Sequence, residues 1–310
     1  MADPVARLLA ANTGLAATVV LWGTMVPLTE RLLATYDPFL LAALRYLVAL
    51  PVLVGFLVLR EGTRLALRTV PWRRVHLLGG IGMCGFATFF TLGIAYSDAV
   101  TAAVILTSGP VVASVMERVM YGTRPAPGLG LALALAVGGG LLVVHGNPAR
   151  EGAGIGFRGG EGLLVLAQGC WSWYSMKAQE WLRGASQVRI TTLTASTAAL
   201  WLVVVLGLAA VVGGDRSPPP WPAADELAIM LWIGAGGAGI AIVFWNNAAR
   251  AMGVSVAALF LNLVPAVAIA TAVLLGAAVT AEQLAGGALV LAGIVQVQAR
   301  RLLRSSGRAR

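Results

Sequence analysis

Residues 97–113 read SDAVTAAVILTSGPVVA, and residues 252–268 read MGVSVAALFLNLVPAVA. When Pro110 is aligned with Pro265, both stretches show a polar or glycine-containing turn, then an alanine pair, then the proline inside an apolar run. Similarity at a fixed offset is the sign of an internal repeat. The pattern therefore predicts that the chain arose by duplication.

Two further correspondences extend this repeat. Thr107 and Asn262 are polar residues three positions before the two prolines, and Trp22 in LWGT aligns with Trp171 in CWSW. We therefore expect two homologous halves, residues 1–150 and residues 151–310. Chance similarity between apolar segments is the alternative.

The composition predicts an all-α membrane protein. Of the 310 residues, 58% are hydrophobic and 11% are charged, whereas a soluble domain carries about 25% charged residues. A helix needs about 20 apolar residues to cross the hydrocarbon core of a bilayer. Ten segments meet this requirement: 12–33, 38–59, 74–95, 99–119, 127–145, 161–181, 190–212, 225–249, 254–276 and 282–303.

Ten spans give each half five. Because five is odd, the second half inserts upside down, and we expect ten transmembrane helices arranged as two inverted five-helix repeats around a central cavity, a recurring plan of secondary transporters. The first apolar segment has no small-residue cleavage site, so we interpret it as a retained helix.

The charge distribution predicts the orientation. With a cytoplasmic N-terminus, most of the 22 basic residues fall on the inner side, as the positive-inside rule requires. Both termini are then cytoplasmic, in the bacterial inner membrane. The net charge of +9 thus reflects membrane topology, so the lipid bilayer is the expected partner and nucleic acid is not.

Several kinds of chemistry find no support in the sequence. Cys84 and Cys170 lie inside predicted spans and form no CxxC or Cys/His cluster, so we expect neither a disulfide nor a metal, and no cofactor. The glycine clusters contain no G-x4-GK[ST] phosphate loop. We therefore expect no ATPase partner, and interpret the glycines as helix-packing positions.

Two tryptophans lie at unusual depth. Trp22 and Trp171 are each about ten residues inside their spans, roughly 15 Å at 1.5 Å per residue, which is the middle of the bilayer. Tyr174 follows Trp171 by three residues and shares its face, whereas Trp173 points away. We predict that Trp22, Trp171 and Tyr174 bind the apolar part of a substrate, with Gln168 and Ser175 on the same stripe. Interhelical packing is the alternative.

Polar residues inside spans are the second set of candidates. Buried amides require hydrogen bonds, so Asn246 and Asn262 should face the protein interior, and Thr107 adds polar lining near the first proline. Arg45 is the one charge clearly inside a span, and intramembrane charges are functional by default. Substrate binding is the prediction for all four residues. Interhelical hydrogen bonding of the asparagines, and a structural partner for Arg45, are the alternatives.

Pro110 and Pro265 each remove a backbone hydrogen bond in mid-span. Their matching positions predict two hinges, or backbone carbonyls exposed to substrate, in the two halves. A static packing kink is the alternative.

The motifs taken together resemble those of EamA-type proteins of the drug/metabolite transporter superfamily. They are LWGTMVPL, the P-x6-R of Pro38 to Arg45, the A-x6-P of Ala103 to Pro110, and the block FWNNAARAMGVSVAALFLNLVPAVA at 244–268. Within the superfamily the chain is most similar to the YddG-type aromatic amino-acid exporters. The resemblance implies a ten-helix bundle of two inverted halves that exports small metabolites. This chain lacks the Gly-Glu pair usual after spans four and nine, with Gly122-Thr123 and Gly276-Ala277 in its place.

Three classes of function compete. A passive channel needs a continuous polar stripe or a ring of charges, and an intramembrane enzyme needs a nucleophile or ligand cluster; the sequence shows neither. We therefore predict a secondary carrier, not an enzyme, that exports small molecules such as aromatic or other neutral amino acids by alternating access. Purines, quaternary amines and drugs are the alternative solutes. No carboxylate lies at mid-depth, which favours facilitated or exchange transport without proton coupling.

Overall fold

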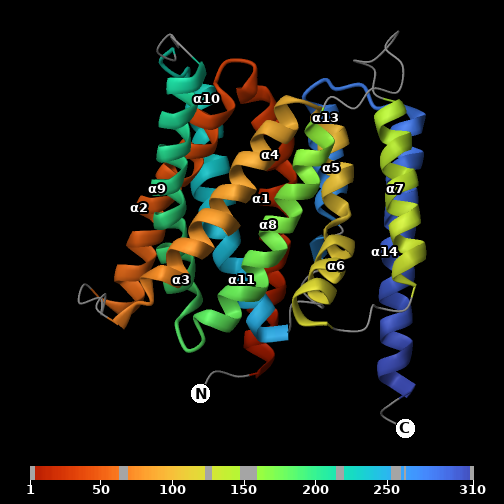
Figure 1. Ribbon diagram of the computed structural model, residues 1–310, viewed down its shortest axis with the longest axis horizontal. Helices are drawn as coiled ribbons and strands as arrows, with labels where there is room; N and C mark the ends of the chain where they lie inside the picture. The colour runs from red at the N-terminus through yellow and green to blue at the C-terminus, as the bar shows by residue number, and fades with distance from the viewer. Residues whose placement is uncertain are drawn as a thin grey trace.

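A computed structural model describes residues 4–62, 69–122, 128–146, 159–213, 220–252, 260–261 and 263–307. Within these residues all regular structure is helical and no strand occurs, so the predicted all-α class is confirmed (Figure 1). The helices are α1 (Pro4–Leu33), α2 (Pro38–Glu61), α3 (Trp72–Leu77), η2 (Leu78–Cys84), α4 (Gly85–Ala95), α5 (Ala99–Thr107), α6 (Gly109–Tyr121), α7 (Leu129–His145), α8 (Gly160–Trp181), α9 (Gln187–Gly213), α10 (Ala224–Leu231), η4 (Trp232–Ile240), α11 (Ala241–Met252), α13 (Val264–Leu274) and α14 (Ala281–Gly307).

Five helical segments are long and apolar enough to cross a membrane: Ala11–Leu33, Pro38–Glu61, Trp72–Ala95, Gln187–Val212 and Ala224–Ala248. The pair α5 and α6 makes a sixth candidate, bent by 46° at the break between the two helices. Two shorter apolar segments lie within α7 and α13. The described residues thus support a multi-pass membrane protein, and the count of ten spans stays a prediction.

The two halves of the chain pack against each other. Helix α1 contacts α11 and α13 from the second half, and α8 contacts α4, α5 and α6 from the first. Helix α2 packs against α9 and η4, and α9 packs in turn against η2. Helices α7 and α14 stand side by side at one edge of the bundle (Figure 1). Each half therefore makes the same kind of contacts with the other: α1 packs on α11 and α13 as α8 packs on α4 and α6.

Two segments of π-helix, η2 and η4, contain the glycine clusters. A Cβ atom at Gly79 in η2 would lie 2.8 Å from the backbone nitrogen of Ala198 in α9. A Cβ atom at Gly234 in η4 would lie 2.9 Å from the carbonyl oxygen of Arg45 in α2. At these positions glycine permits close helix approach, as predicted. Such π-helical turns are rare and frequently lie at functional sites.

Aspartate caps fix the start of two helices that reach the centre of the bundle. Asp37 accepts hydrogen bonds from the backbone nitrogens of Phe39 and Leu40, at 2.9 and 3.2 Å, at the start of α2. Asp98 accepts one from the backbone nitrogen of Thr101, at 2.9 Å, at the start of α5. These bonds satisfy amide groups that the first turn of a helix leaves unpaired.

The core consists of three clusters of buried apolar side chains. Trp22 packs against all three clusters, and Trp171 packs against two of them. The two tryptophans predicted at mid-depth therefore lie where the clusters meet. Helix α1 begins and α14 ends at the same end of the bundle (Figure 1).

Candidate functional site

A cavity of about 100 Å³ lies at the meeting point of the core clusters. Helices α1, α2, α4, α5, α8, α11 and α13 and the segment η4 contribute to its wall. Five aromatic side chains line it, Trp22, Tyr46, Phe86, Phe90 and Trp171, together with the polar side chains of Arg45 and Gln168. Most of the wall is thus apolar, with few polar groups, as is usual for small-molecule sites.

The aromatic rings form a connected network. Trp22 from α1 and Trp171 from α8 meet edge to face, with ring centres 5.5 Å apart. Phe86 lies 5.4 Å from both Trp171 and Phe90. The indole nitrogen of Trp22 donates a hydrogen bond of 3.0 Å to the carbonyl of Gly237 in η4. Trp22 and Trp171 are therefore brought together across the two halves, and both line the cavity.

Arg45 is the charged residue of this cavity wall. Its side chain is buried, with 2% exposure, and one terminal nitrogen lies 3.4 Å from the sulfur of Met25. The guanidinium carbon lies 5.0 Å from the ring centre of Phe90. Within the described part of the chain, Nε and Nη1 have no hydrogen-bond partner and no carboxylate pairs with the group. A buried cation without a counter-charge is costly, so the site is suited to bind an anion.

Tyr174 and Asn246, both predicted to bind substrate, are not among the residues that line the cavity. The Tyr174 ring lies 5.3 Å from that of Trp171 but is fully buried behind it, and its hydroxyl lies 3.3 Å from the Thr194 hydroxyl. Asn246 donates a hydrogen bond of 3.0 Å to the hydroxyl of Thr191. Helix α9 therefore satisfies both polar groups, and the alternative of interhelical hydrogen bonding describes Asn246.

The prolines stand at matching helix breaks. Helix α5 ends at Thr107 and α6 begins at Gly109, so that Pro110 occupies the first turn of α6. Pro265 is in the first turn of α13, is buried, and lines the cavity. Regular helix is thus interrupted just before each of the two prolines predicted to be hinges. Asn262 lies outside the described residues, as do the side chains of Thr107 and Pro110.

The structure adds residues that the sequence did not single out as binding groups. Phe86 and Phe90 are spaced four apart in GFATFF and line the cavity together; their spacing on one helix face was the available signal. Trp245 in α11 lies 5.9 Å from Trp22 and extends the aromatic network. Gln168, expected only as an extension of the Trp171 stripe, also lines the cavity.

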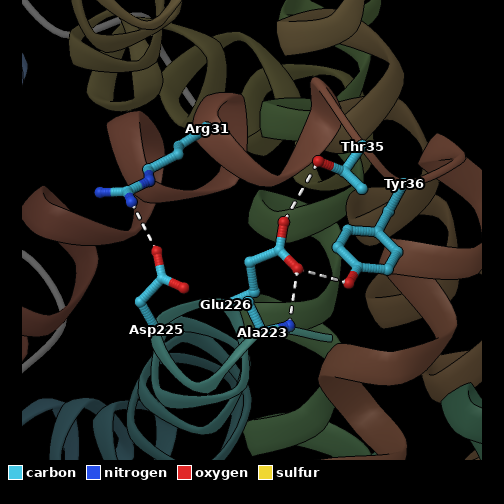
Figure 2. Close-up of polar contacts among 6 residues, drawn as sticks. All are labelled: Arg31, Thr35, Tyr36, Ala223, Asp225 and Glu226. Carbon is cyan, nitrogen blue, oxygen red and sulfur yellow. Dashed lines mark hydrogen bonds and ion pairs between the residues drawn. The ribbon is translucent and has the colours of Figure 1, made fainter. Parts of the chain in front are cut away.

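At one end of the bundle, α1 and the turn after it bind the start of α10 (Figure 2). Arg31 pairs with Asp225 at 2.6 Å, and Glu226 accepts hydrogen bonds from Thr35 and Tyr36 at 3.2 and 2.8 Å. We call these five residues the α1–α10 clasp. Desolvation and the bond to Glu226 raise the pKa of Tyr36, so its hydroxyl stays a donor at neutral pH. The clasp joins the two halves of the chain.

A profile of the EamA-like transporter family matches residues 10–145 and, a second time, residues 158–297. The chain belongs to the EamA-like transporter family. It is 24% identical over 275 residues to the uncharacterized transporter YyaM of Bacillus subtilis (strain 168), an alignment that covers 88% of each chain. A crystal structure of a protein 20% identical superposes with a TM-score of 0.67 over 94% of this chain and 98% of the other, and shows a shared fold.

Membership in the EamA-like family confirms the resemblance read from the motifs and makes the chain a membrane transporter. The family is matched once in each half of the chain.

Proposed function

We propose that this EamA transporter is a secondary carrier that exports small amphipathic carboxylates, foremost aromatic or other neutral amino acids, across the bacterial inner membrane by alternating access. Trp22, Trp171 and their phenylalanine neighbours enclose the apolar part of the substrate. Arg45 binds the carboxylate. The resemblance of the sequence motifs to those of the YddG-type aromatic amino-acid exporters supports this choice of substrate.

Buried, unpaired Arg45 is the observation that carries this proposal. Its guanidinium sits on the wall of an aromatic cavity, with two nitrogens that no described residue bonds. A substrate carboxylate supplies the missing counter-charge and accepts paired N–H bonds, for which guanidinium has the matching geometry. The same positive charge disfavours quaternary amines, one of the alternative solutes.

The architecture supports alternating access by two inverted repeats, residues 1–150 and 151–310, of five transmembrane helices each. The family profile matches once in each half. Three pairs of elements occupy equivalent places in the two halves and make equivalent contacts: α1 and α8, α2 and α9, and η2 and η4. Helix α1 starts and α14 ends at one end of the bundle, as ten spans with two cytoplasmic termini require. Pro110 and Pro265 would be the hinges at which one repeat moves against the other.

Binding in detergent tests the substrate class. Phenylalanine at about 100 times its Kd should stabilise the purified protein by about 2.7 kcal/mol, because a ligand that binds only the folded state shifts unfolding by mass action. Phenylalanine methyl ester, which keeps the ring and the amine, should give little shift in the unfolding midpoint, and so should tetramethylammonium. Equal stabilisation by the acid and its ester would show that the carboxylate is not recognised.

The α1–α10 clasp is expected to favour the state closed at its end of the cavity. Replacing Asp225 by Asn together with Glu226 by Gln removes the ion pair and weakens the Tyr36 contact, worth about 1–2 kcal/mol together. A cysteine placed at Val26 on the cavity wall, with Cys84 and Cys170 replaced by alanine, should then react about 5–20-fold faster with a membrane-impermeant thiol reagent added outside intact cells.

The contacts at the opposite end supply the matched control. Glu180 pairs with Lys177 at 2.7 Å and accepts a hydrogen bond of 2.8 Å from Tyr121 in α6. Glu180→Gln should leave outside reactivity unchanged or lower it. An unchanged rate in the clasp variant would show that the clasp does not govern access.

A further inference from the structure

Gln168, like Arg45, is a polar side chain on the cavity wall. It lies on α8 three residues before Trp171, is 8% exposed, and lines the cavity together with Arg45. Its Nε2 donates a hydrogen bond to the backbone carbonyl of Leu106 at the end of α5. The amide is therefore held between the two halves of the chain.

Pro110 explains why that carbonyl needs a side-chain donor. In a continuous helix the carbonyl of residue 106 accepts from the N–H of residue 110, and proline has no N–H. Gly109 leaves room for the replacement donor, since a Cβ atom there would lie 2.6 Å from Nε2 of Gln168. An unpaired buried carbonyl is costly, so the bond to Leu106 fixes the orientation of the Gln168 amide.

A fixed amide presents its oxygen as an acceptor. One N–H of Nε2 donates to Leu106, which leaves Oε1 as the acceptor of this amide and a second N–H as a further donor. Leu261, whose carbonyl Pro265 likewise deprives of its helical N–H donor, lines the same cavity. Aligning Trp22 with Trp171 places Val19 opposite Gln168, so the amide is not required by the repeat itself.

We propose that Gln168 determines specificity for the ammonium group: Oε1 accepts a hydrogen bond from the amine of a zwitterionic substrate whose carboxylate binds Arg45. This inference rests on the proposed function and assigns a residue to recognition of the ammonium group of its foremost substrates, the neutral amino acids. Simple carboxylates with the same apolar part would bind Arg45 without using Gln168.

Two ligands that differ only in the ammonium group test this role. Phenylalanine and 3-phenylpropionate are compared by Kd on the purified full-length protein, for the wild type, Gln168→Leu and Gln168→Glu. Hydrogen bonds to charged groups are worth about 1.5–3 kcal/mol, roughly 10–100-fold. Gln168→Leu should weaken phenylalanine binding by about that factor and leave 3-phenylpropionate binding unchanged. Gln168→Glu loses the N–H donor to Leu106 but keeps an acceptor and adds a negative charge, so it should weaken 3-phenylpropionate more than phenylalanine and retain the preference for phenylalanine.

The outcomes separate this inference from the proposed function. Equal weakening of both ligands by Gln168→Leu, or loss of the preference in Gln168→Glu, would mean that the amide acts only on the Leu106 carbonyl, and would overturn the inference. Equal wild-type affinity for the two ligands would overturn it as well. Wild-type protein that binds neither ligand would overturn the proposed function itself, as would unchanged binding of 3-phenylpropionate in Arg45→Met.

Discussion

Arg45→Met is expected to lower the affinity for a carboxylate substrate at least about 30-fold and to abolish measurable transport, while the fold remains as stable as the wild type or becomes more stable. Removing one partner of a buried charge pair costs about 2–5 kcal/mol of binding. In the protein without ligand, the substitution should not lower the free energy of unfolding, because Nε and Nη1 of Arg45 have no described partner to lose. Replacing buried charge by apolar volume is often neutral or stabilising by about 1–4 kcal/mol.

The two effects of Arg45→Met are measured on the same preparation, as ligand Kd and as the free energy or midpoint of unfolding in detergent. Arg60, exposed at the other end of the same helix, provides the control: Arg60→Met should change neither. A large loss of stability in Arg45→Met with binding intact would assign Arg45 a structural role and remove it from the site.

Trp171→Ala is expected to lower affinity by about 10–100-fold in addition to destabilising the protein. The ring meets Trp22 and Phe86 at 5.5 and 5.4 Å on the cavity wall, so its loss opens the wall toward Tyr174. Truncation of a fully buried tryptophan costs about 3–5 kcal/mol of stability. Trp171 is partly buried, so a smaller loss is expected, but activity alone would still be ambiguous.

Trp173 on the same helix resolves the ambiguity. Its ring packs edge to face against Trp181 at 5.6 Å and does not line the cavity. Trp173→Ala should destabilise the protein without lowering its affinity for substrate. The Kd values of the two variants are compared for the fraction of each protein that remains folded. If the two variants lost affinity equally, the effect at Trp171 would come from general destabilisation.

Position along a single helix was the part of the site that could be argued from sequence. Trp22 and Trp171 were selected because each lies about ten residues into its span, and Arg45 because it is an isolated intramembrane charge; all three line the cavity. These arguments depend on distance along one helix, which the rise per residue fixes.

The direction in which a side chain points was harder to predict. Tyr174 packs beside Trp171, as their spacing predicts, but its hydroxyl lies 3.3 Å from that of Thr194 in α9 and its ring does not line the cavity. Asn246 likewise finds Thr191 on α9. The hydrogen-bond partner of a buried polar group depends on tertiary packing. Helical periodicity gives no information about which neighbouring helix supplies that partner.

The π-helical segments show a second limit. The glycine clusters at 79–85 and 234–239 were interpreted as close-packing positions, and Gly79 and Gly234 do approach neighbouring helices closely. The extra residue in each π-helical turn was not predictable, because it shifts the helix register without changing the hydrophobic pattern. In η4 this segment supplies the Gly237 carbonyl that holds the ring of Trp22.

Counterflow in proteoliposomes tests the central claim, that this protein is a carrier with a saturable site for amino acids. Vesicles loaded with unlabelled phenylalanine should transiently concentrate external radiolabelled phenylalanine, without a pH gradient, and vesicles containing Arg45→Met should not. Uptake that rises linearly with concentration, shows no counterflow and is accompanied by single-channel conductance would contradict the carrier.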